Sequence, residues 1–328
     1  MKPPQKILII KTGALGDIIL SSISFKTIKK NFSTYKIFLL TKSEFIEVVK
    51  DCPFLEKIFV LPSKKNLGEF LNFLLILRRE KFRIIFDIQG NLKTNFYSFL
   101  IGAKERIGLY RKKIGKLFLT KGIRKRDDLN PVEHQRYFFE KIGIETEENL
   151  ELWIKEKKEY RNFLKKYKLE NGNYILIHPV ASPEWKTKRW LPERFAALAD
   201  ILIEKGEKVV FIGKGKKEIE KIIKKMKNKP LNLSDETTIS QLIFIIKNSK
   251  VVITTDSAPL HIGAASGVKT IGIFGPTDPE RHCPPQVRYI YKKVPCSPCH
   301  KKKCDKMICM KEIKVKDILE KIYERNKL

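Results

Sequence analysis

The stretch that decides the fold is SKVVITTDSAPLHIGAASGVKTIGIFGPT, residues 249–277. It predicts a buried strand over residues 251–253 and a polar turn over residues 254–257. A helix then begins near Pro259, because proline has no backbone N–H to lose in the first helical turn. A second apolar strand follows over residues 269–274. The polar turn therefore lies at a helix N-terminus and at one edge of a parallel sheet.

Such a sheet edge is where α/β proteins bind ligands. The free N–H groups and the positive end of the helix dipole favour phosphate, and Asp256 and Ser257 carry side chains suited to sugar hydroxyls. In the simpler alternative, Asp256 or Ser257 only caps the helix, as in any α/β domain. This turn alone does not decide between the two interpretations.

Length and charge limit the possible functions. The 328 residues suffice for two domains of about 150 residues each. Lys and Arg outnumber Asp and Glu by 67 to 37, a formal net charge of +30. This excess predicts an anionic partner, which is nucleic acid, an anionic lipid surface or a phosphorylated substrate. Part of it is expected from solvated Lys-rich helices such as residues 214–229, as in heat-adapted proteomes.

No membrane-spanning or signal segment is predicted. The first residues, MKPPQKILIIKTG, contain an apolar run of only four residues, which is short for the core of a signal peptide. The longest apolar patch, residues 70–77, contains Asn72 and is far shorter than the roughly 20 residues of a spanning helix. We expect a cytoplasmic protein that is soluble or peripheral to a membrane.

Four of the six cysteines lie close together near the C-terminus, with the spacing C-x2-C-x4-C-x4-C. They are Cys296, Cys299, Cys304 and Cys309. In a cytosolic chain this clustering favours a metal over disulfides. The spacing departs from the usual pair of C-x2-C hooks, so a structural zinc, reduced thiols and disulfides remain alternatives.

The N-terminal residues repeat the pattern of strand, glycine turn and helix. Residues 7–10 form the predicted strand, and KTGALGD precedes an amphipathic helix with apolar positions from Leu15 to Ile23. The order G-x-x-G-D is neither a dinucleotide fingerprint nor a Walker A loop. It places Asp17 in the first helical turn, at the C-terminal edge of the strand. The simplest role for Asp17 is to complement the helix dipole.

Strand and helix patterns then alternate along both halves of the chain. The predicted strands are residues 35–40, 57–60, 83–86, 174–177, 209–212 and 230–233, and the predicted helices include residues 43–50, 67–79, 192–204 and 238–247. This alternation indicates parallel sheets with right-handed crossovers. The turns DIQGN, residues 87–91, and PVASPEWKTKRW, residues 179–190, lie at ligand-binding edges. The highly charged residues 147–168 mark a domain junction, so we expect domains over residues 1–155 and 156–328.

The combination resembles glycosyltransferase family 9, the ADP-heptose:lipopolysaccharide heptosyltransferases. The resemblance spans nearly the whole chain and rests on KILIIKTGALGDIILSS, DIQGNLK, KTKRWLPERFAALADIL and TTDSAPLHIGAASGVKTIGIFGPTDPERHCP. The segment CSPCHKKKC resembles the heptosyltransferase II branch. The family implies an α/β protein of the GT-B fold, with two Rossmann-like domains whose parallel sheets face a cleft. The acceptor binds the first domain and the nucleotide sugar binds the second.

The resemblance also implies roles for individual residues. Asp17 is the catalytic base, Lys188 contacts the donor phosphates and Asp256 holds heptose hydroxyls. The other implied donor residues are Ser182, Thr187, Glu218 toward ribose, Thr237 toward adenine, Ser257, Ala258 and His261. The implied acceptor residues are Lys11, Thr12, Gly13, Gln89, Asn91 and Arg106. In one departure, Ala258 stands where the family usually has glycine, which leaves the donor preference open.

The implied reaction is the inverting, metal-independent transfer of heptose from ADP-heptose to Kdo or heptose on lipid A, in the lipopolysaccharide inner core. No cofactor is expected for catalysis, and the implied partners are an ADP-sugar, the anionic lipid A core and the inner face of the inner membrane. One alternative is another GT-B enzyme that uses a UDP-sugar, as a transferase or a 2-epimerase. The other is a basic nucleic-acid-binding protein, although no aromatic stacking platform or recognition helix stands out.

Overall fold

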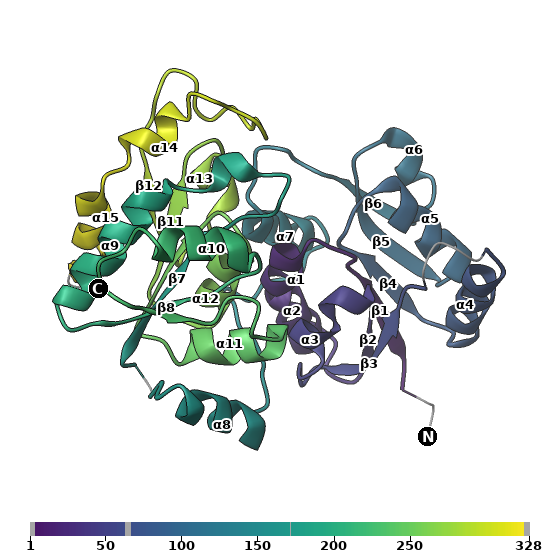
Figure 1. The fold of residues 1–328 in the computed structure, drawn as a ribbon. Helices are drawn as coiled ribbons and strands as arrows, with labels where there is room; N and C mark the ends of the chain where they lie inside the picture. The colour runs from purple at the N-terminus through teal and green to yellow at the C-terminus, as the bar shows by residue number, and fades with distance from the viewer. Residues whose placement is uncertain (1–3, 63–66, 171, 325–328) are drawn as a thin grey trace. The chain divides into compact units, whose positions relative to one another are not determined.

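The computed structural model describes residues 4–62, 67–170 and 172–324 (Figure 1). Contacts between Cα atoms divide the chain into two compact units, Met1–Trp153 and Ile154–Leu328. Within the described ranges, each unit has a parallel sheet of six strands with helices between them. The α/β class predicted from the sequence is therefore confirmed.

The N-terminal unit has the strand order β3-β2-β1-β4-β5-β6. Its strands are β1 (Lys6–Ile10), β2 (Lys36–Thr41), β3 (Leu55–Val60), β4 (Ile84–Asp87), β5 (Glu105–Tyr110) and β6 (Lys121–Arg124). Its helices are α1 (Leu15–Leu20), α2 (Ser22–Asn31), the short 3-10 turn η1 (Ser43–Phe45), α3 (Ile46–Val49), α4 (Leu67–Arg79), α5 (Leu92–Ile101), α6 (Lys113–Lys116) and α7 (Pro131–Glu140). The strand order reverses between β1 and β4. The turns after these two strands therefore lie where doubly wound sheets bind ligands.

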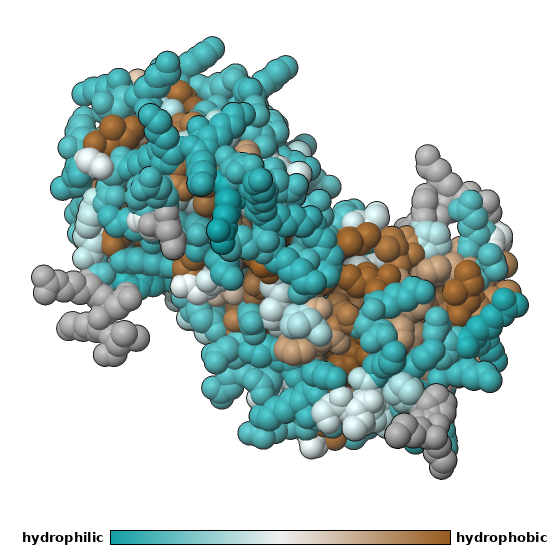
Figure 2. Space-filling view, turned by 90° about the horizontal axis from the view of Figure 1, so that it is seen from below, coloured by the Kyte–Doolittle hydropathy of each residue, from teal (hydrophilic) through white to brown (hydrophobic). Residues whose placement is uncertain are grey.

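The core of this unit follows from the uninterrupted apolar strands. In β1, Ile7 to Ile10 are all 0% exposed, because helices cover both faces of a parallel sheet. Strand β1 is central and pairs with β2 and β4 in parallel register. The surface is different: Figure 2 shows apolar side chains, in brown, gathered on the N-terminal unit, at the right of the picture. The visible surface of the C-terminal unit is mostly hydrophilic.

The C-terminal unit repeats this topology, with the strand order β12-β11-β10-β7-β8-β9. Its strands are β7 (Tyr174–His178), β8 (Lys208–Phe211), β9 (Leu231–Asn232), β10 (Val251–Thr255), β11 (Thr270–Phe274) and β12 (Arg288–Tyr291). Its helices are α8 (Lys158–Lys166), the 3-10 turn η2 (Lys186–Lys188), α9 (Pro192–Glu204), α10 (Lys216–Ile223), α11 (Ile239–Lys247), α12 (Ala258–Ala265), α13 (Pro279–His282), α14 (Ile308–Glu312) and α15 (Val315–Tyr323). Here the order reverses between β7 and β10, so the turns after these strands are the equivalent ligand-binding position.

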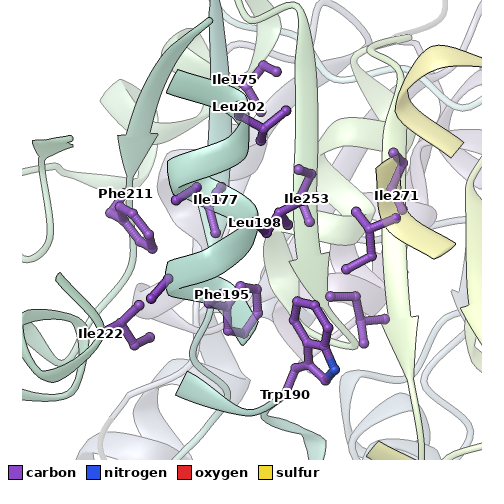
Figure 3. Close-up of a cluster of buried hydrophobic side chains, with 14 of the residues drawn as sticks. Ile175, Ile177, Trp190, Phe195, Leu198, Leu202, Phe211, Ile222, Ile253 and Ile271 are labelled. Carbon is purple, nitrogen blue, oxygen red and sulfur yellow. The ribbon is translucent and has the colours of Figure 1, made fainter. Parts of the chain in front are cut away.

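A buried cluster anchors the segment between β7 and α9. Figure 3 shows Phe195 and Leu198 of α9 and the ring of Trp190 close to strand residues such as Ile253. The Trp190 ring packs edge-on against Phe195, with centroids 5.1 Å apart, and its Nε1 donates a hydrogen bond to the carbonyl of Ile313 at 3.2 Å. Trp190 is 2% exposed and lies two residues after η2. The core therefore fixes the end of η2.

In the described part of the chain, no helix has both the length and the apolarity needed to cross a bilayer.

One predicted helix differs from the structure. Residues 15–23 were expected to form one helix, but α1 ends at Leu20 and α2 begins at Ser22. The Oγ of Ser21 donates to the carbonyl of Asp17 at 2.7 Å, and such a local side-chain bond competes with the helical pattern.

Candidate active site

The turn after β10 holds a buried ion pair. Asp256 is 7% exposed, and its Oδ2 lies 2.7 Å from Nζ of Lys188 and accepts a hydrogen bond from Oγ1 of Thr277 at 2.8 Å. Burial alone would raise the pKa of Asp256, but the charge of Lys188 and these hydrogen bonds lower it. The carboxylate and the ammonium therefore face each other in ionised form at the C-terminal edge of the sheet.

Neither Asp256 nor Ser257 caps α12. Ser257 occupies the N-cap position, but its side chain makes no capping hydrogen bond. Its Oγ instead lies 3.1 Å from Nδ1 of His178 and donates to the carbonyl of Thr255 at 3.1 Å. The interpretation of this turn as a capped helix alone is therefore wrong. No side-chain cap covers the amino end of α12, which leaves it open to an anion.

His178 supports this turn from the end of β7. Burial lowers its pKa to about 4, so the imidazole is neutral near pH 7. Its Nδ1 lies 3.3 Å from the Thr254 hydroxyl, besides the contact with Ser257. Gly213 leaves room for the ring, since a Cβ there would lie 2.8 Å from Cδ2 of His178. The side chain of Ser257 is therefore held by buried groups.

The loop that carries Lys188 is fixed by its neighbours. The ammonium of Lys188 lies 4.6 Å from the ring centroid of Trp185, within cation–π range. The hydroxyl of Thr187 is buried and donates to the carbonyl of Lys301 at 2.7 Å. Thr187 was expected to bind the donor, but its hydroxyl is already bonded within the protein. This hydrogen bond ties η2 to the segment that contains Lys301.

The other predicted donor residues lie at the same sheet edge. Ser182 is exposed in the loop after β7, and Glu218 is in the first turn of α10. Thr237 lies in the connection between β9 and α11, His261 is one turn into α12, and Ala258 is its first residue. All five follow the C-terminal end of a strand. The structure thus brings them to the edge that holds the Lys188–Asp256 pair.

One further residue at this edge escaped the sequence analysis. His282, at the end of α13, is close enough to Asp256 for the carboxylate charge to act on it. Burial lowers the pKa of His282, and Asp256 partly opposes this shift. The ring of His300 packs against it, with centroids 5.6 Å apart. The motif DPERH contains His282, but only the fold brings it to Asp256.

A pocket of about 580 Å³ lies at the corresponding edge of the N-terminal unit. Four of the predicted acceptor residues line it: Thr12, Gly13, Gln89 and Asn91. Lys42, Phe45, Lys93 and Tyr97 are among the other lining residues. Gly13 has φ +143°, a conformation that L side chains rarely adopt. The pocket is therefore lined by backbone turns, two lysines and two aromatic side chains.

The two turns that form this pocket are joined directly. The Thr12 N–H donates to Oε1 of Gln89 at 3.0 Å, which links the turn after β1 to the turn after β4. Asp87 holds the second turn by accepting from the N–H groups of Gln89 and Gly90, both at 3.1 Å, and from Nδ2 of Asn95 at 2.7 Å. Burial raises the pKa of Asp87 to about 6. Asp87 is 0% exposed, so it positions the turn and has no access to a substrate.

Asp17 lies in the first turn of α1, and its side chain is 41% exposed. Its Oδ2 accepts from the Ala14 N–H at 3.4 Å and lies 3.7 Å from Nζ of Lys11. A second cation, Lys125, is close enough for the Asp17 carboxylate to act on it. Burial and the positive charges of Lys11 and Arg111 lower the pKa of Lys125, while Asp17 partly opposes them. The accessible carboxylate of Asp17 thus lies near Lys11 and Lys125.

Arg106 does not join this group. It lies near the N-terminal end of β5, whereas the pocket lies beyond the C-terminal ends of the strands. Its Nε donates to the carbonyl of Phe118 at 3.0 Å and its Nη1 to that of Ala103 at 2.8 Å. Arg106 therefore has a structural role instead of the predicted contact with the acceptor. Its hydrogen bonds join β5 to the residues that precede β5 and β6.

The four clustered cysteines are free thiols in this structure. All six cysteines are free thiols, with Cys309 buried and Cys296 and Cys304 exposed. Among the described residues, no three His, Cys, Asp or Glu side chains are grouped as metal ligands. Burial raises the pKa of Cys309, and the charges of the neighbouring three cysteines add to this. The four residues nevertheless share one segment, and their thiols are the donors that zinc prefers.

Two doubly wound α/β units with polar turns at both strand-order reversals are what the GT-B fold requires. The sequence model of glycosyltransferase family 9 (heptosyltransferase) matches residues 72–309, and the chain belongs to this family. It is 27% identical to lipooligosaccharide heptosyltransferase 2 of Campylobacter jejuni, over 96% of this chain and 97% of the relative. The resemblance inferred from the motifs is confirmed, and the protein is a glycosyltransferase.

Solved structures support the same fold. The family 9 glycosyltransferase of Veillonella parvula has a TM-score of 0.83 at 22% identity, over 96% of this chain and 95% of its own. The ADP-heptose lps heptosyltransferase II of E. coli has a TM-score of 0.79 at 19% identity, over 97% of both chains. The predicted GT-B fold is confirmed by these likenesses. Family membership, and not the fold, sets aside the nucleic-acid-binding alternative.

Proposed function

We propose that the protein transfers heptose from ADP-heptose to the lipopolysaccharide inner core, with inversion at the anomeric carbon and without a catalytic metal. Family membership supports the heptosyl donor, and the relative from Campylobacter jejuni is named for this activity. The observation that carries the proposal is the buried pair of Lys188 and Asp256 beside the uncapped amino end of α12. A cation and a helix N-terminus suit a diphosphate, and a buried carboxylate suits sugar hydroxyls.

On the donor side, the ammonium of Lys188 and the amino end of α12 would bind the diphosphate. Asp256 would accept hydrogen bonds from heptose hydroxyls, with Ser257 held beside it by His178. Glu218 and Thr237 would contact the ribose and the adenine. Glu218 follows β8 and Thr237 follows β9, and both strands lie on the side of β7 opposite to β10. As the bond between the anomeric carbon and the phosphate oxygen breaks, Lys188 would neutralise the charge left on ADP.

On the acceptor side, Asp17 would act as the general base. Its carboxylate would take the proton of the acceptor hydroxyl while that oxygen attacks the anomeric carbon from the face opposite to ADP. The partial exposure of Asp17 leaves it accessible to the hydroxyl. Lys11, Arg111 and Lys125 would bind the anionic groups of the acceptor and hold the hydroxyl in place, and this positioning supplies part of the rate.

The N-terminal unit would therefore be the acceptor domain and the C-terminal unit the nucleotide-sugar domain. The acceptor is a lipid A core, which is anionic, and the net charge of +30 suits a protein that works at an anionic surface. We therefore expect the protein in the cytoplasm, peripheral to the inner face of the inner membrane. The four clustered cysteines would hold a structural zinc.

Transfer assays test the proposal directly. Purified protein is incubated with an ADP-heptose and a lipid A core acceptor, and mass spectrometry detects the addition of one heptose. Parallel reactions contain UDP-sugars, and another set contains a chelator. Transfer from ADP-heptose that survives chelation supports the proposal. Transfer from a UDP-sugar alone would assign the protein to the other class of GT-B donor, and loss of activity with the chelator would contradict the metal-independent mechanism.

A further inference from the structure

Exposed apolar side chains are concentrated on one part of the N-terminal unit. Across the described ranges, eleven large hydrophobic side chains are exposed, and eight of these lie on or directly beside α4, α5 and α6. We call these eight the α4–α6 apolar surface: Leu71, Leu75, Ile76, Leu92, Phe96, Phe99, Ile114 and Leu117. The other three are scattered over the C-terminal unit. Figure 2 shows the same contrast between the two units.

Helix α4 is apolar on both of its faces. Leu74 and Leu77 point into the buried core, where they are 5% and 0% exposed. Leu71 and Leu75 lie on the opposite face and are 51% and 53% exposed. A helix that is apolar all round is normally buried, and a solvated helix normally carries polar residues on its outer face. The outer face of α4 therefore has the composition of a contact surface.

The three helices present one continuous surface. Helix α5 contacts both α4 and α6. The Phe118 ring, just after α6, lies 5.2 Å from the Phe96 ring and 5.7 Å from the Phe99 ring, between centroids. At the other side, Nη1 of Arg78 at the end of α4 donates to the carbonyl of Leu100 at 3.2 Å. An apolar patch of this extent marks an interaction site on a protein surface.

The residues around this surface are strongly basic. Residues 92–121 contain eight Lys or Arg and one acidic residue, Glu105, which pairs with Arg83 at 2.9 Å. Lys112, Lys113 and Lys116 are exposed on or next to α6 and take part in no ion pair with the residues that the structure describes. A second copy of this chain would bring the same positive charge against the surface, which disfavours self-association. An anionic lipid surface complements both the charge and the apolar side chains.

The surface also adjoins the acceptor pocket. Helix α5 begins at that pocket, where Asn91, Lys93 and Tyr97 line it, and the same helix carries Leu92 and Phe96 outward. We propose that the α4–α6 apolar surface inserts into the headgroup region of an anionic bilayer, with the lysines around α6 on lipid phosphates. The mouth of the pocket then lies beside the lipid. The docking proposal rests on the proposed function in one respect, which is that the acceptor is linked to a lipid.

Vesicle binding tests the proposal without either substrate. Full-length protein is sedimented with phosphatidylcholine vesicles that contain or lack phosphatidylglycerol, at low and high salt. The apolar variant combines Leu71→Ser, Leu75→Ser and Leu117→Ser, and its matched control combines Tyr289→Ser and Ile308→Ser on the C-terminal unit. The basic variant carries Gln in place of Lys112, Lys113 and Lys116, and its control carries Gln in place of Lys221, Lys224 and Lys225 around α10. Melting temperatures and light-scattering masses are measured on each.

We expect wild-type protein to bind the anionic vesicles. The apolar variant should bind at least about tenfold more weakly, because three leucines no longer leave water on binding. Each lysine contributes about fivefold at low salt, so the basic variant should also lose binding. Both controls should bind like the wild type, with all variants folded. If the lysine control loses as much vesicle binding as the basic variant, general electrostatic attraction explains the binding and the proposal is overturned. Unchanged binding by the apolar variant, or a wild-type dimer that it converts to monomer, would also overturn it.

The same variants separate this proposal from the proposed function. A water-soluble acceptor that lacks its acyl chains needs no docking, so the apolar variant should transfer to it at the wild-type rate. Transfer to the soluble acceptor with no vesicle binding would reject the docking surface alone. Vesicle binding without any transfer would reject the proposed function alone.

Discussion

The Nζ of Lys188 lies 2.7 Å from Oδ2 of Asp256, and this pair joins η2 to the turn after β10. The two side chains are 16% and 7% exposed, so each charge depends on the other for compensation. A donor diphosphate that binds as we propose would therefore share Lys188 with Asp256. The donor would also bring sugar hydroxyls that compensate the carboxylate. The ion pair thus holds both groups ready for a ligand that carries an anion next to a sugar.

Replacement of Lys188 should weaken donor binding. We expect Lys188→Ala to cost about 1.5 to 3 kcal/mol of ADP-heptose affinity, the value of a charge-assisted hydrogen bond. It should also lower the melting temperature, because Asp256 is left buried without its cation. Lys188→Ala combined with Asp256→Asn should restore part of the stability and none of the affinity. Lys186→Ala, an exposed lysine of the same turn, is the control. Isothermal titration calorimetry that finds wild-type affinity in Lys188→Ala would remove Lys188 from the donor site.

Replacement of Asp17 separates its two candidate roles. Asp17→Asn keeps the size and the acceptor oxygen toward the Ala14 N–H, so the helix should lose only about 0.3 to 1 kcal/mol of dipole stabilisation. It cannot accept a proton, and transfer should fall by roughly 10²- to 10⁴-fold with an unchanged donor dissociation constant. Asp128→Asn, an exposed surface aspartate, should leave kcat unaffected. A kcat above about a tenth of the wild-type value in Asp17→Asn would exclude the role of base.

Asp87 should make stability depend on pH. Its pKa in the folded protein is raised from 3.8 to about 6 by burial, so folding favours the protonated form. Its contribution to the free energy of unfolding is complete below pH 4 and is lost as the pH rises through 6. The melting temperature of Asp87→Asn relative to wild type should therefore improve between pH 4 and 7. A constant difference across that range would show that the folded pKa is not raised.

The cysteine segment makes a further prediction. We expect about one zinc per chain in purified protein, bound by Cys296, Cys299, Cys304 and Cys309 after a local rearrangement of their thiols. Elemental analysis should find the metal in wild type and in Cys52→Ser, which lies outside the segment. It should find none in Cys299→Ser. Metal-free protein with full stability and activity would identify these residues as plain thiols.

The sequence predicted the parts of the fold that have strong local patterns. The helices over residues 67–79 and 192–204 have the predicted bounds, because each has a clear apolar periodicity and a charged or proline boundary. Strands β5, β6 and β12 were not predicted. Their sequences, ERIGLY, KGIR and RYIY, alternate with charged residues and form at or next to the edges of the sheets. Pairing with a neighbouring strand, rather than local preference, places them there.

The site was predictable to the extent that its residues lie in turns after strands. Such positions meet at one sheet edge in any doubly wound fold, which is why Thr12 and Gln89 come together. Contacts made by distant segments were not predictable. Lys125 approaches Lys11 and Asp17 only through the chain path after β6, and His282 approaches Asp256 only through α13. Asp87 has a polar sequence context, yet its burial depends on Asn95 and on the neighbouring strand.

The loop with Lys188 is tied to the cysteine-rich segment, residues 296–309, at two points, and to the residue after α14 at a third. Thr187 donates to the carbonyl of Lys301, Glu184 pairs with Lys302 at 2.9 Å, and Trp190 donates to the carbonyl of Ile313. Any energetic coupling that passes through these contacts acts equally in both directions. If metal loading or oxidation of the cysteines shifts this segment, it changes the affinity for the nucleotide sugar. Bound nucleotide sugar then changes the metal affinity or the redox potential of the cysteines by the same factor.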